Sequence, residues 1–344
     1  MHTTGSLATA LAAGPVVLDG GLATELEAQG HDVGSALWSA RLLRDDPAAV
    51  VAAHAAFAAA GAQVATTASY QATVEGFAAA GLDAAAAREL VTRSVRLARE
   101  GAPDGWVAGS VGPYGAMLAD GSEYTGAYLD PQWSGRAGGG LSVAELRDFH
   151  RPRMTWLAEA GVDVLAAETL PGAAEAEAVL AEAAALGVPV WLSLTTVTGA
   201  DGVVRTRRGE PAAAVLAAAA SSPGVVAVGV NCTDPAGVLA AVQAAGTPCV
   251  VYPNSGEVWD AAGRRWTGRP GLPTADVRAW VAAGARLVGG CCRVSPADVR
   301  TVAAALTSTW RSATGEESSP VAPRHRTGQR IGVPPVTATR APDT

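Results

Sequence analysis

Two stretches near the end of the chain decide the predicted fold: Val225-Val-Ala-Val-Gly-Val-Asn-Cys232 and Leu287-Val-Gly-Gly-Cys-Cys-Arg293. Each begins as a short, apolar and largely β-branched run, which predicts a buried strand, and each ends at a thiol. Strands that are apolar on both faces are typical of parallel sheets covered by helices. These stretches therefore predict an α/β fold that places cysteines at the carboxyl ends of its strands.

Similar apolar runs recur along the chain, with alanine-rich helical stretches between them. Eight strands are predicted, at residues 16–19, 63–68, 106–111, 164–168, 190–195, 225–231, 249–252 and 287–290. Before three of these strands, a helical stretch ends at a glycine, as expected for a repeated unit. Eight β-strand and α-helix units close naturally into a (β/α)8, or TIM, barrel, whose strand ends meet at one mouth.

The 344 residues, of which 49% are hydrophobic, are enough for one large domain, predicted over residues 1–314. From Gly315 onward Pro, Ser, Thr and Arg dominate, so residues 315–344 are expected to form a disordered Pro- and Arg-rich tail. Two long segments, 112–140 and 254–273, follow the third and seventh strands. Long loops in these positions are usually lids or binding loops.

Composition restricts the class of partner. The formal net charge of -7 argues against nucleic acid or an anionic membrane surface as a partner. Four cysteines do not make a disulfide framework, and the sequence contains no apolar run of about 20 residues. No charged region with a cleavage signal precedes the apolar Leu7 to Ala13, so a signal peptide is not expected. We therefore expect a cytoplasmic protein with reduced thiols, a monomer or weak homo-oligomer, that acts on small molecules.

Three of the four cysteines are candidate metal ligands. Cys232, Cys291 and Cys292 follow two strands that are separated by one other strand, so their thiols can meet at the mouth. Adjacent strand residues point to opposite faces, so Cys291 and Cys292 share a target only if the backbone leaves strand geometry, which the two preceding glycines permit. Three thiolates suit Zn²⁺ and leave a fourth position open. A vicinal disulfide is the alternative, and Cys249 is expected to be a buried apolar residue.

Other polar residues also fall at predicted strand ends. Glu168 ends an otherwise apolar strand, so its carboxylate either faces the mouth or is buried at high cost. The Asp19-Gly20-Gly21 turn is either a tight turn or a set of backbone amides for a substrate carboxylate. The full set of polar residues at strand ends is Asp19, Thr66, Thr67, Tyr70, Ser110, Glu168, Thr195, Thr196, Asn231, Cys232, Asn254, Cys291 and Cys292.

Aromatic residues in the predicted mouth loops either stack on a cationic ligand or pack against the protein. They are Trp38, Tyr70, Tyr114, Tyr124, Tyr128 and Trp259. The five histidines lack metal-ligand spacing, and His54 and His150, in predicted helices, are expected at the surface.

Taken together, the motifs resemble those of the homocysteine S-methyltransferase family over residues 15–310. The matching stretches are Asp19-Gly-Gly, Thr66-Thr-Ala-Ser-Tyr-Gln-Ala72, Gly109-Ser-Val-Gly-Pro-Tyr-Gly115, Asp120-Gly-Ser-Glu-Tyr124, Glu168-Thr, Gly229-Val-Asn-Cys232, Tyr252-Pro-Asn-Ser-Gly-Glu257 and Gly289-Gly-Cys-Cys-Arg293. The sixth and eighth of these stretches carry the three cysteines.

The resemblance implies transfer of a methyl group from S-methylmethionine or S-adenosylmethionine to the thiol of homocysteine, giving methionine. It implies Zn²⁺ bound by Cys232, Cys291 and Cys292, with Glu168 and the backbone of Asp19 to Gly21 at the amino-acid end of homocysteine. Glu168 is the candidate catalytic residue. The candidate substrate-binding residues are Asp19, Gly20, Gly21, Thr66, Tyr70, Ser110, Tyr114, Glu168 and Asn231.

Three other functions would share some of these features. A non-catalytic zinc or redox-sensing barrel protein would also cluster cysteines, but it would not need polar groups at eight strand ends. A betaine-type methyl donor is a further alternative, although the motifs resemble the sulfonium-dependent branch. A phosphate-binding barrel should carry a glycine-rich anion loop after strand 7 or 8, whereas here the eighth strand ends in two thiols.

Overall fold

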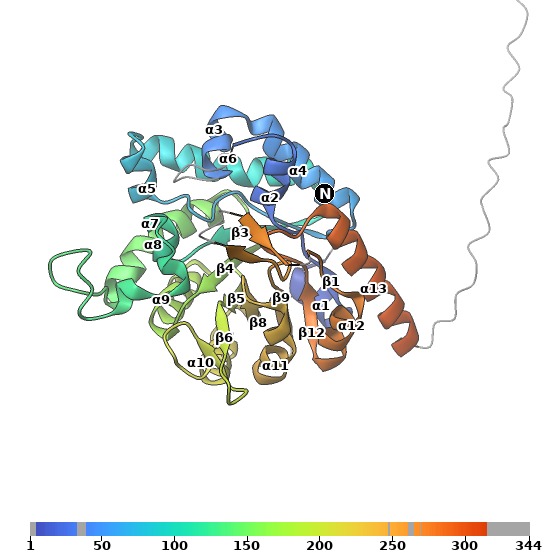
Figure 1. Ribbon diagram of the computed structural model, residues 1–344. Coiled ribbons are helices and arrows are strands. Elements are labelled where there is room, and N and C mark those ends of the chain that lie inside the picture. Colours follow the sequence, from blue (N-terminus) through green and yellow to red (C-terminus); the bar gives the residue numbers. More distant parts are fainter. Residues whose placement is uncertain (1–4, 33–38, 247, 261–264, 269, 315–344) are drawn as a thin grey trace, which may run out of the picture.

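The computed structural model describes residues 5–32, 39–246, 248–260, 265–268 and 270–314 (Figure 1). The predicted tail and Trp38 lie outside the described residues, as does the side chain of Trp259. Among the described helices, none combines the length and apolar character needed to cross a bilayer.

Eight parallel strands form the barrel, and all eight correspond to predicted strands. In sheet order they are β1 (Val16–Val17), β12 (Ala285–Val288), β9 (Cys249–Tyr252), β8 (Val225–Asn231), β5 (Val190–Leu194), β4 (Val164–Leu170), β3 (Trp106–Val111) and β2 (Val64–Thr66). A parallel bridge between Leu18 and Val64 joins the first strand to the last. The sheet is therefore closed, and the predicted (β/α)8 fold is confirmed.

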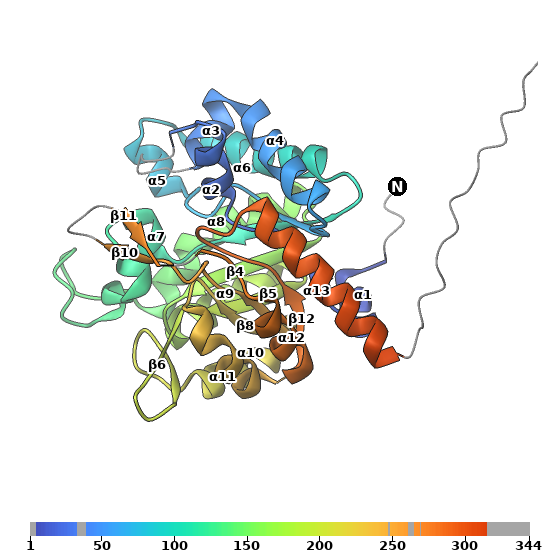
Figure 2. The ribbon, with the colours of Figure 1, turned by 45° about the vertical axis from the view of Figure 1, so that its right-hand side comes forward.

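Helices surround the sheet; in both ribbon views α2 to α6 gather on one side and α10 to α12 on the opposite side (Figures 1 and 2). The helices are α1 (Leu7–Ala13), α2 (Leu22–Ala28), α3 (Ser39–Asp45), α4 (Pro47–Ala59), α5 (Val74–Ala79), α6 (Ala84–Gly101), α7 (Tyr114–Leu118), η1 (Ser122–Tyr124), η2 (Ala127–Leu129), α8 (Val143–Glu159), α9 (Ala173–Leu186), α10 (Ala212–Ala220), α11 (Pro235–Ala245), α12 (Thr274–Ala283) and α13 (Pro296–Thr314). Side chains cap two of these helices: Asp46 accepts from the amide of Ala49, and Ser142 and Glu145 form a capping box.

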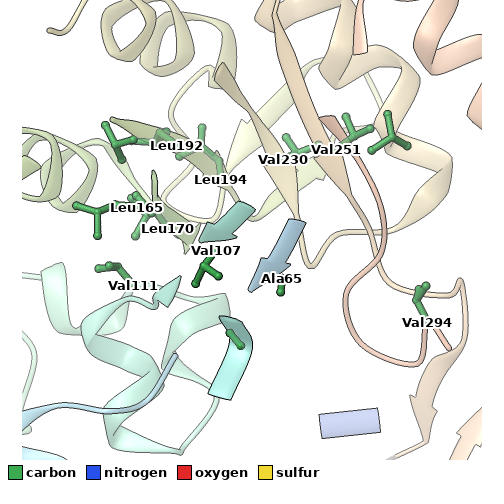
Figure 3. Close-up of a cluster of buried hydrophobic side chains, with 14 of the residues drawn as sticks. Ala65, Val107, Val111, Leu165, Leu170, Leu192, Leu194, Val230, Val251 and Val294 are labelled. Carbon is green, nitrogen blue, oxygen red and sulfur yellow. The ribbon is translucent and has the colours of Figure 1, made fainter. Parts of the chain in front are cut away.

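Alternate residues of the strands face two different apolar clusters. Leu165, Leu192 and Val251 belong to the larger cluster, which packs the strands against the surrounding helices (Figure 3). The smaller cluster contains strand residues such as Trp191 together with Leu7 and Leu11 of α1, so it fills the barrel and is covered by α1. Burial on both faces explains why the strands are continuous apolar runs.

The segments that follow the strands carry more structure than the sequence indicated. The 112–140 segment contains α7 and the two short 3-10 helices η1 and η2, and the 254–273 segment contains a hairpin of β10 (Val258–Asp260) and β11 (Arg265–Thr267). A second hairpin, of β6 (Thr196–Thr198) and β7 (Val204–Thr206), lies between β5 and α10 and was not predicted.

The expectation that His54 and His150 lie at the surface was wrong. Both side chains are buried, because α4 and α8 pack these faces against neighbouring elements. Burial lowers the pKa of His54 to about 4, so this ring is neutral near pH 7. His150 lies 2.8 Å from the carboxylate of Glu175 and 2.9 Å from Arg153, in a buried polar network.

Candidate functional site

The three predicted cysteines meet at the mouth of the barrel. Cys232 directly follows β8 with φ of 47°, a left-handed conformation unusual for a residue with a side chain. Cys291 and Cys292 follow β12, where the Cys291 amide donates to the carbonyl of Pro253 and the Cys292 amide to the side chain of Asn254. The Sγ atoms are 2.8 Å (Cys232 to Cys291), 3.7 Å (Cys232 to Cys292) and 4.0 Å (Cys291 to Cys292) apart.

These distances can be compared with those required by a metal ion. Three sulfurs bound at 2.3 Å in a tetrahedral zinc site lie about 3.8 Å from one another. The two distances to Cys292 match this value, and a small rotation of the Cys232 and Cys291 side chains would open the third. All four cysteines are free thiols, including Cys291 and Cys292, so the vicinal disulfide is not formed. The cluster therefore fits a soft metal ion with thiolate ligands.

The hydrogen bonds among the thiols also shift the pKa values of Cys291 and Cys292 in opposite directions. Hydrogen bonds from Cys232 and Cys291 lower the pKa of Cys292 well below its usual range. The contact with Cys232 raises the pKa of Cys291. Cys292 is therefore the thiol of this pair that ionises more readily.

Four glycines let the strand ends approach closely enough to form this cluster. A Cβ atom on Gly289 would lie 2.5 Å from the carbonyl oxygen of Asp19, and one on Gly290 would lie 2.2 Å from Val294. Similarly, a Cβ atom on Gly21 would lie 2.6 Å from the carbonyl oxygen of Cys291, and Gly20 is equally crowded. Neither Gly289 nor Gly290 has a positive φ. Their contribution is therefore space between backbones rather than an unusual conformation.

Two carboxylates face the same cavity as the thiols. Asp19 accepts from the amide of Thr66 at 2.6 Å and from its hydroxyl at 2.9 Å, while Glu168 accepts from the hydroxyl of Ser110. Burial raises the pKa of both carboxyls to about 7, and the hydrogen bonds oppose the rise without cancelling it. Each carboxyl would be ionised more fully if a cation bound beside it.

The cavity is acidic. None of its lining residues is Lys, Arg or His, whereas two are carboxylic acids and three are cysteines. Its lining residues are Asp19, Gly20, Gly21, Leu22, Ala23, Thr24, Thr66, Thr67, Ala68, Tyr70, Ser110, Tyr124, Glu168, Thr169, Cys232, Tyr252, Gly290, Cys291 and Cys292. A lining of thiols and carboxylates without a cationic side chain favours metal ions, ammonium groups and other cations as ligands.

Most of the predicted site residues line this cavity, but two do not. Asn231 lies behind it and fixes Thr169, accepting from its amide at 2.7 Å and donating to its hydroxyl at 2.8 Å. Tyr114 points elsewhere, because its ring packs against Tyr128 and Phe149, with ring centroids 5.3 and 4.8 Å away. The Gly21 amide donates to the carbonyl of Val294, so this amide is not available to a substrate carboxylate.

Other residues of the cavity were not among the candidate substrate-binding residues. The Tyr124 hydroxyl lies 3.5 Å from the sulfur of Cys232, and Thr169 lines the cavity with a positive φ of 62°. Tyr252, at the end of β9, contacts the hydroxyl of Ser193 at 2.6 Å. Tyr252 ends β9 and Thr169 is the last residue but one of β4, so their positions could have indicated the site. Tyr124 lies in a segment without periodicity, where the sequence gives no direction for a side chain.

This fold, with cysteines gathered at the carboxyl ends of its strands, defines a class of barrel enzymes that bind substrates at that mouth. A family model described as homocysteine S-methyltransferase matches residues 16–306, and the chain belongs to this family.

Characterised relatives agree with this assignment. "Homocysteine S-methyltransferase" of Escherichia coli (strain K12) is 45% identical over 303 residues, which cover 83% of this chain and 93% of the relative. "Homocysteine S-methyltransferase 4" of Zea mays is 42% identical over 86% of this chain and 90% of the relative. The metallated crystal structure of the homocysteine methyltransferase MmuM from Escherichia coli superposes with a TM-score of 0.72 at 41% identity, covering 85% of this chain and 96% of that one.

The buried carboxyl of Glu168 predicts a measurable effect on stability. Burial raises the pKa of this carboxyl in the folded protein to about 7, above its ordinary value of 4.5. The contribution of this group to folding is therefore fully present below pH 4.5 and is lost as the pH rises through 7. Glu168→Gln, which keeps an acceptor for Ser110, should raise the free energy of unfolding of the metal-free protein by about 1–3 kcal/mol at pH 8.

Denaturant titrations of both proteins at pH 4 and pH 8 measure this effect. At pH 4 the two should be nearly equally stable, because Glu168 is largely protonated in both the folded and unfolded states. A variant that is equally or less stable than the unsubstituted protein at pH 8 would contradict the raised pKa.

Proposed function

We propose that this protein transfers a methyl group from a sulfonium donor, S-methylmethionine or S-adenosylmethionine, to the thiol of homocysteine, giving methionine. The observation that carries the proposal is the convergence of three thiols and two carboxyls in one cavity lined by no cationic side chain. Membership of the homocysteine S-methyltransferase family supports the reaction. We place the protein in the cytoplasm, where thiols remain reduced and available to a metal ion.

Cys232, Cys291 and Cys292 would hold one Zn²⁺ ion. When bound, zinc supplies a Lewis acid that favours the thiolate form of a substrate thiol and fixes its position. Three protein ligands leave a fourth tetrahedral position for that substrate. The hydrogen bonds of the Cys291 and Cys292 amides hold the backbone of their loop in place.

The carboxyls would orient homocysteine. Glu168 lines the cavity with Cys232, so its carboxylate is suited to the ammonium group of an amino acid whose sulfur lies at the cysteine cluster. Ser110 and Thr66 hold the two carboxyls in position through hydrogen bonds. Fixing the acceptor in this way supplies the positional advantage on which a bimolecular methyl transfer depends.

Removal of a single thiol tests the metal site. Cys232→Ser, Cys291→Ser and Cys292→Ser should each lose most of the bound zinc, because hydroxyl groups are poor ligands for this soft site. Cys249→Ser is the matched control, since Cys249 is buried in β9 away from the cavity. Elemental analysis of the four purified proteins gives the zinc content per chain. Full zinc content in the first three variants would remove these residues from the metal site.

Neutralising Glu168 tests its contact with homocysteine. A charge-assisted hydrogen bond is worth about 1.5–3 kcal/mol, so Glu168→Gln should weaken homocysteine binding about 10- to 150-fold while zinc remains bound. In the unsubstituted protein the affinity should rise as the pH increases through about 7, because protonated Glu168 cannot pair with ammonium. Calorimetric titrations across this range measure both effects. A Gln variant with unchanged affinity would exclude Glu168 from the ammonium site.

The reaction itself is tested by incubating the zinc-loaded protein with homocysteine and S-methylmethionine, S-adenosylmethionine or betaine, and measuring methionine. We expect methionine from the sulfonium donors, with a higher kcat/KM for S-methylmethionine because it needs no room for adenosine. Methionine formed with betaine alone would identify the wrong donor class. Zinc binding that is unaffected by homocysteine, with no methionine formed, would favour a non-catalytic zinc or redox protein.

A further inference from the structure

The unpredicted β6–β7 hairpin brings an arginine to the edge of the candidate site. Arg207, directly after β7, lies over the ring of Tyr124, with its guanidinium carbon 5.6 Å from the ring centroid. Tyr124 lines the cavity, and its hydroxyl lies 3.5 Å from the sulfur of Cys232. Hydrogen bonds also link Arg207 to the cysteine cluster. Its Nε donates to the hydroxyl of Thr195 at 3.2 Å, and this hydroxyl donates to the Cys232 carbonyl at 3.1 Å.

The two other arginines of this segment have acidic partners, but Arg207 does not. Arg205 pairs with Asp201 at 2.7 Å and Arg208 with Asp130 at 3.8 Å. Within the described part of the chain, Arg207 forms no ion pair and its two terminal nitrogens donate no hydrogen bond. The side chain is half-buried, and burial lowers its pKa. A half-buried guanidinium with a free fork is suited to binding a planar anion in two-point contact.

The proposed reaction requires such a group. Homocysteine and S-methylmethionine are both amino acids, so two carboxylates must be accommodated near a cavity whose own lining is acidic. The Gly21 amide is already occupied by Val294. Arg207 is a cation, and it contacts the ring of Tyr124, which lines the cavity.

The position of Arg207 indicates which substrate it serves. Glu168, assigned to the acceptor, is still within β4, whereas Tyr124 and Arg207 belong to segments that follow the barrel strands β3 and β5. They lie beyond the strand ends, where a second substrate would approach an acceptor already held at the cysteine cluster. We propose that Arg207 binds the carboxylate of the methyl donor, a sulfonium derivative of an α-amino acid. This inference rests on the proposed function and adds a specificity-determining residue to it.

Equilibrium binding tests the contact independently of methyl transfer. The zinc-loaded protein is titrated calorimetrically with S-methylmethionine and with its carboxamide, which keeps the sulfonium and ammonium groups but loses the anion. The unsubstituted protein should bind the carboxylate form about 10- to 100-fold more tightly. Arg207→Met should lose this preference, and Arg207→Lys, which keeps the charge without the fork, should keep part of it.

Arg205→Met is the matched control, because it removes a positive charge from the same hairpin at an arginine already paired with Asp201. It should retain the full preference. Equal binding of the two ligands by the unsubstituted protein, or an equal loss in both Met variants, would overturn the proposal. A loss of homocysteine affinity in Arg207→Met that equals the loss for the donor would assign Arg207 to the acceptor instead. Absence of methionine in the reaction assay would contradict the proposed function, while the binding comparison would still decide the role of Arg207.

Discussion

The close contact between the ends of β1 and β12 is the constraint on which the site depends. The amide of Gly290 donates to the carbonyl of Asp19 at 3.0 Å, and the amide of Gly21 donates to Val294 at the same distance. Any side chain on these glycines would collide with the opposing backbone or with Val294. The same contact joins β1 to β12 at the mouth, positions Cys291 and leaves the Asp19 carboxylate facing Thr66 of β2. The pairing of these two strands and the approach of Cys291 to the mouth therefore depend on the same backbone contact.

The site is built at a cost in stability. Asp19 and Glu168 are buried without a cation among the lining side chains, and burial holds the pKa of each near 7. In the absence of ligands, both groups oppose folding as the pH rises through the neutral range. A bound metal ion and a substrate ammonium group would relieve this penalty, so occupation of the site should stabilise the protein. Residues that destabilise the empty protein are typical of binding sites for charged ligands.

A buried network behind the cavity supports the segments that carry Tyr70 and Tyr124. Arg153 of α8 donates to the carbonyls of Tyr70 and Gly112 at 2.9 and 2.7 Å. Glu175 of α9 accepts from the amide of Tyr114 at 2.7 Å and from the hydroxyl of Tyr128. His150 connects the two charged side chains. The mouth segment after β3 is thereby fixed to the helical layer, which explains why an irregular segment can hold Tyr124 beside Cys232.

The sequence alone determined the eight strands, the barrel and the three cysteines. These features are encoded locally: apolar runs identify buried strands, and in a closed parallel barrel a residue at a strand end must lie at the mouth. Glu168, Asp19, Thr66 and Ser110 could be placed for the same reason. Only the tertiary structure decided which neighbouring side chains enter the cavity. Asn231 lies behind it, Tyr114 packs elsewhere, His54 and His150 are buried, and Arg207 reaches Tyr124 across 83 residues of sequence. Those directions depend on packing between segments that are distant in the chain, and no local pattern of residues records them.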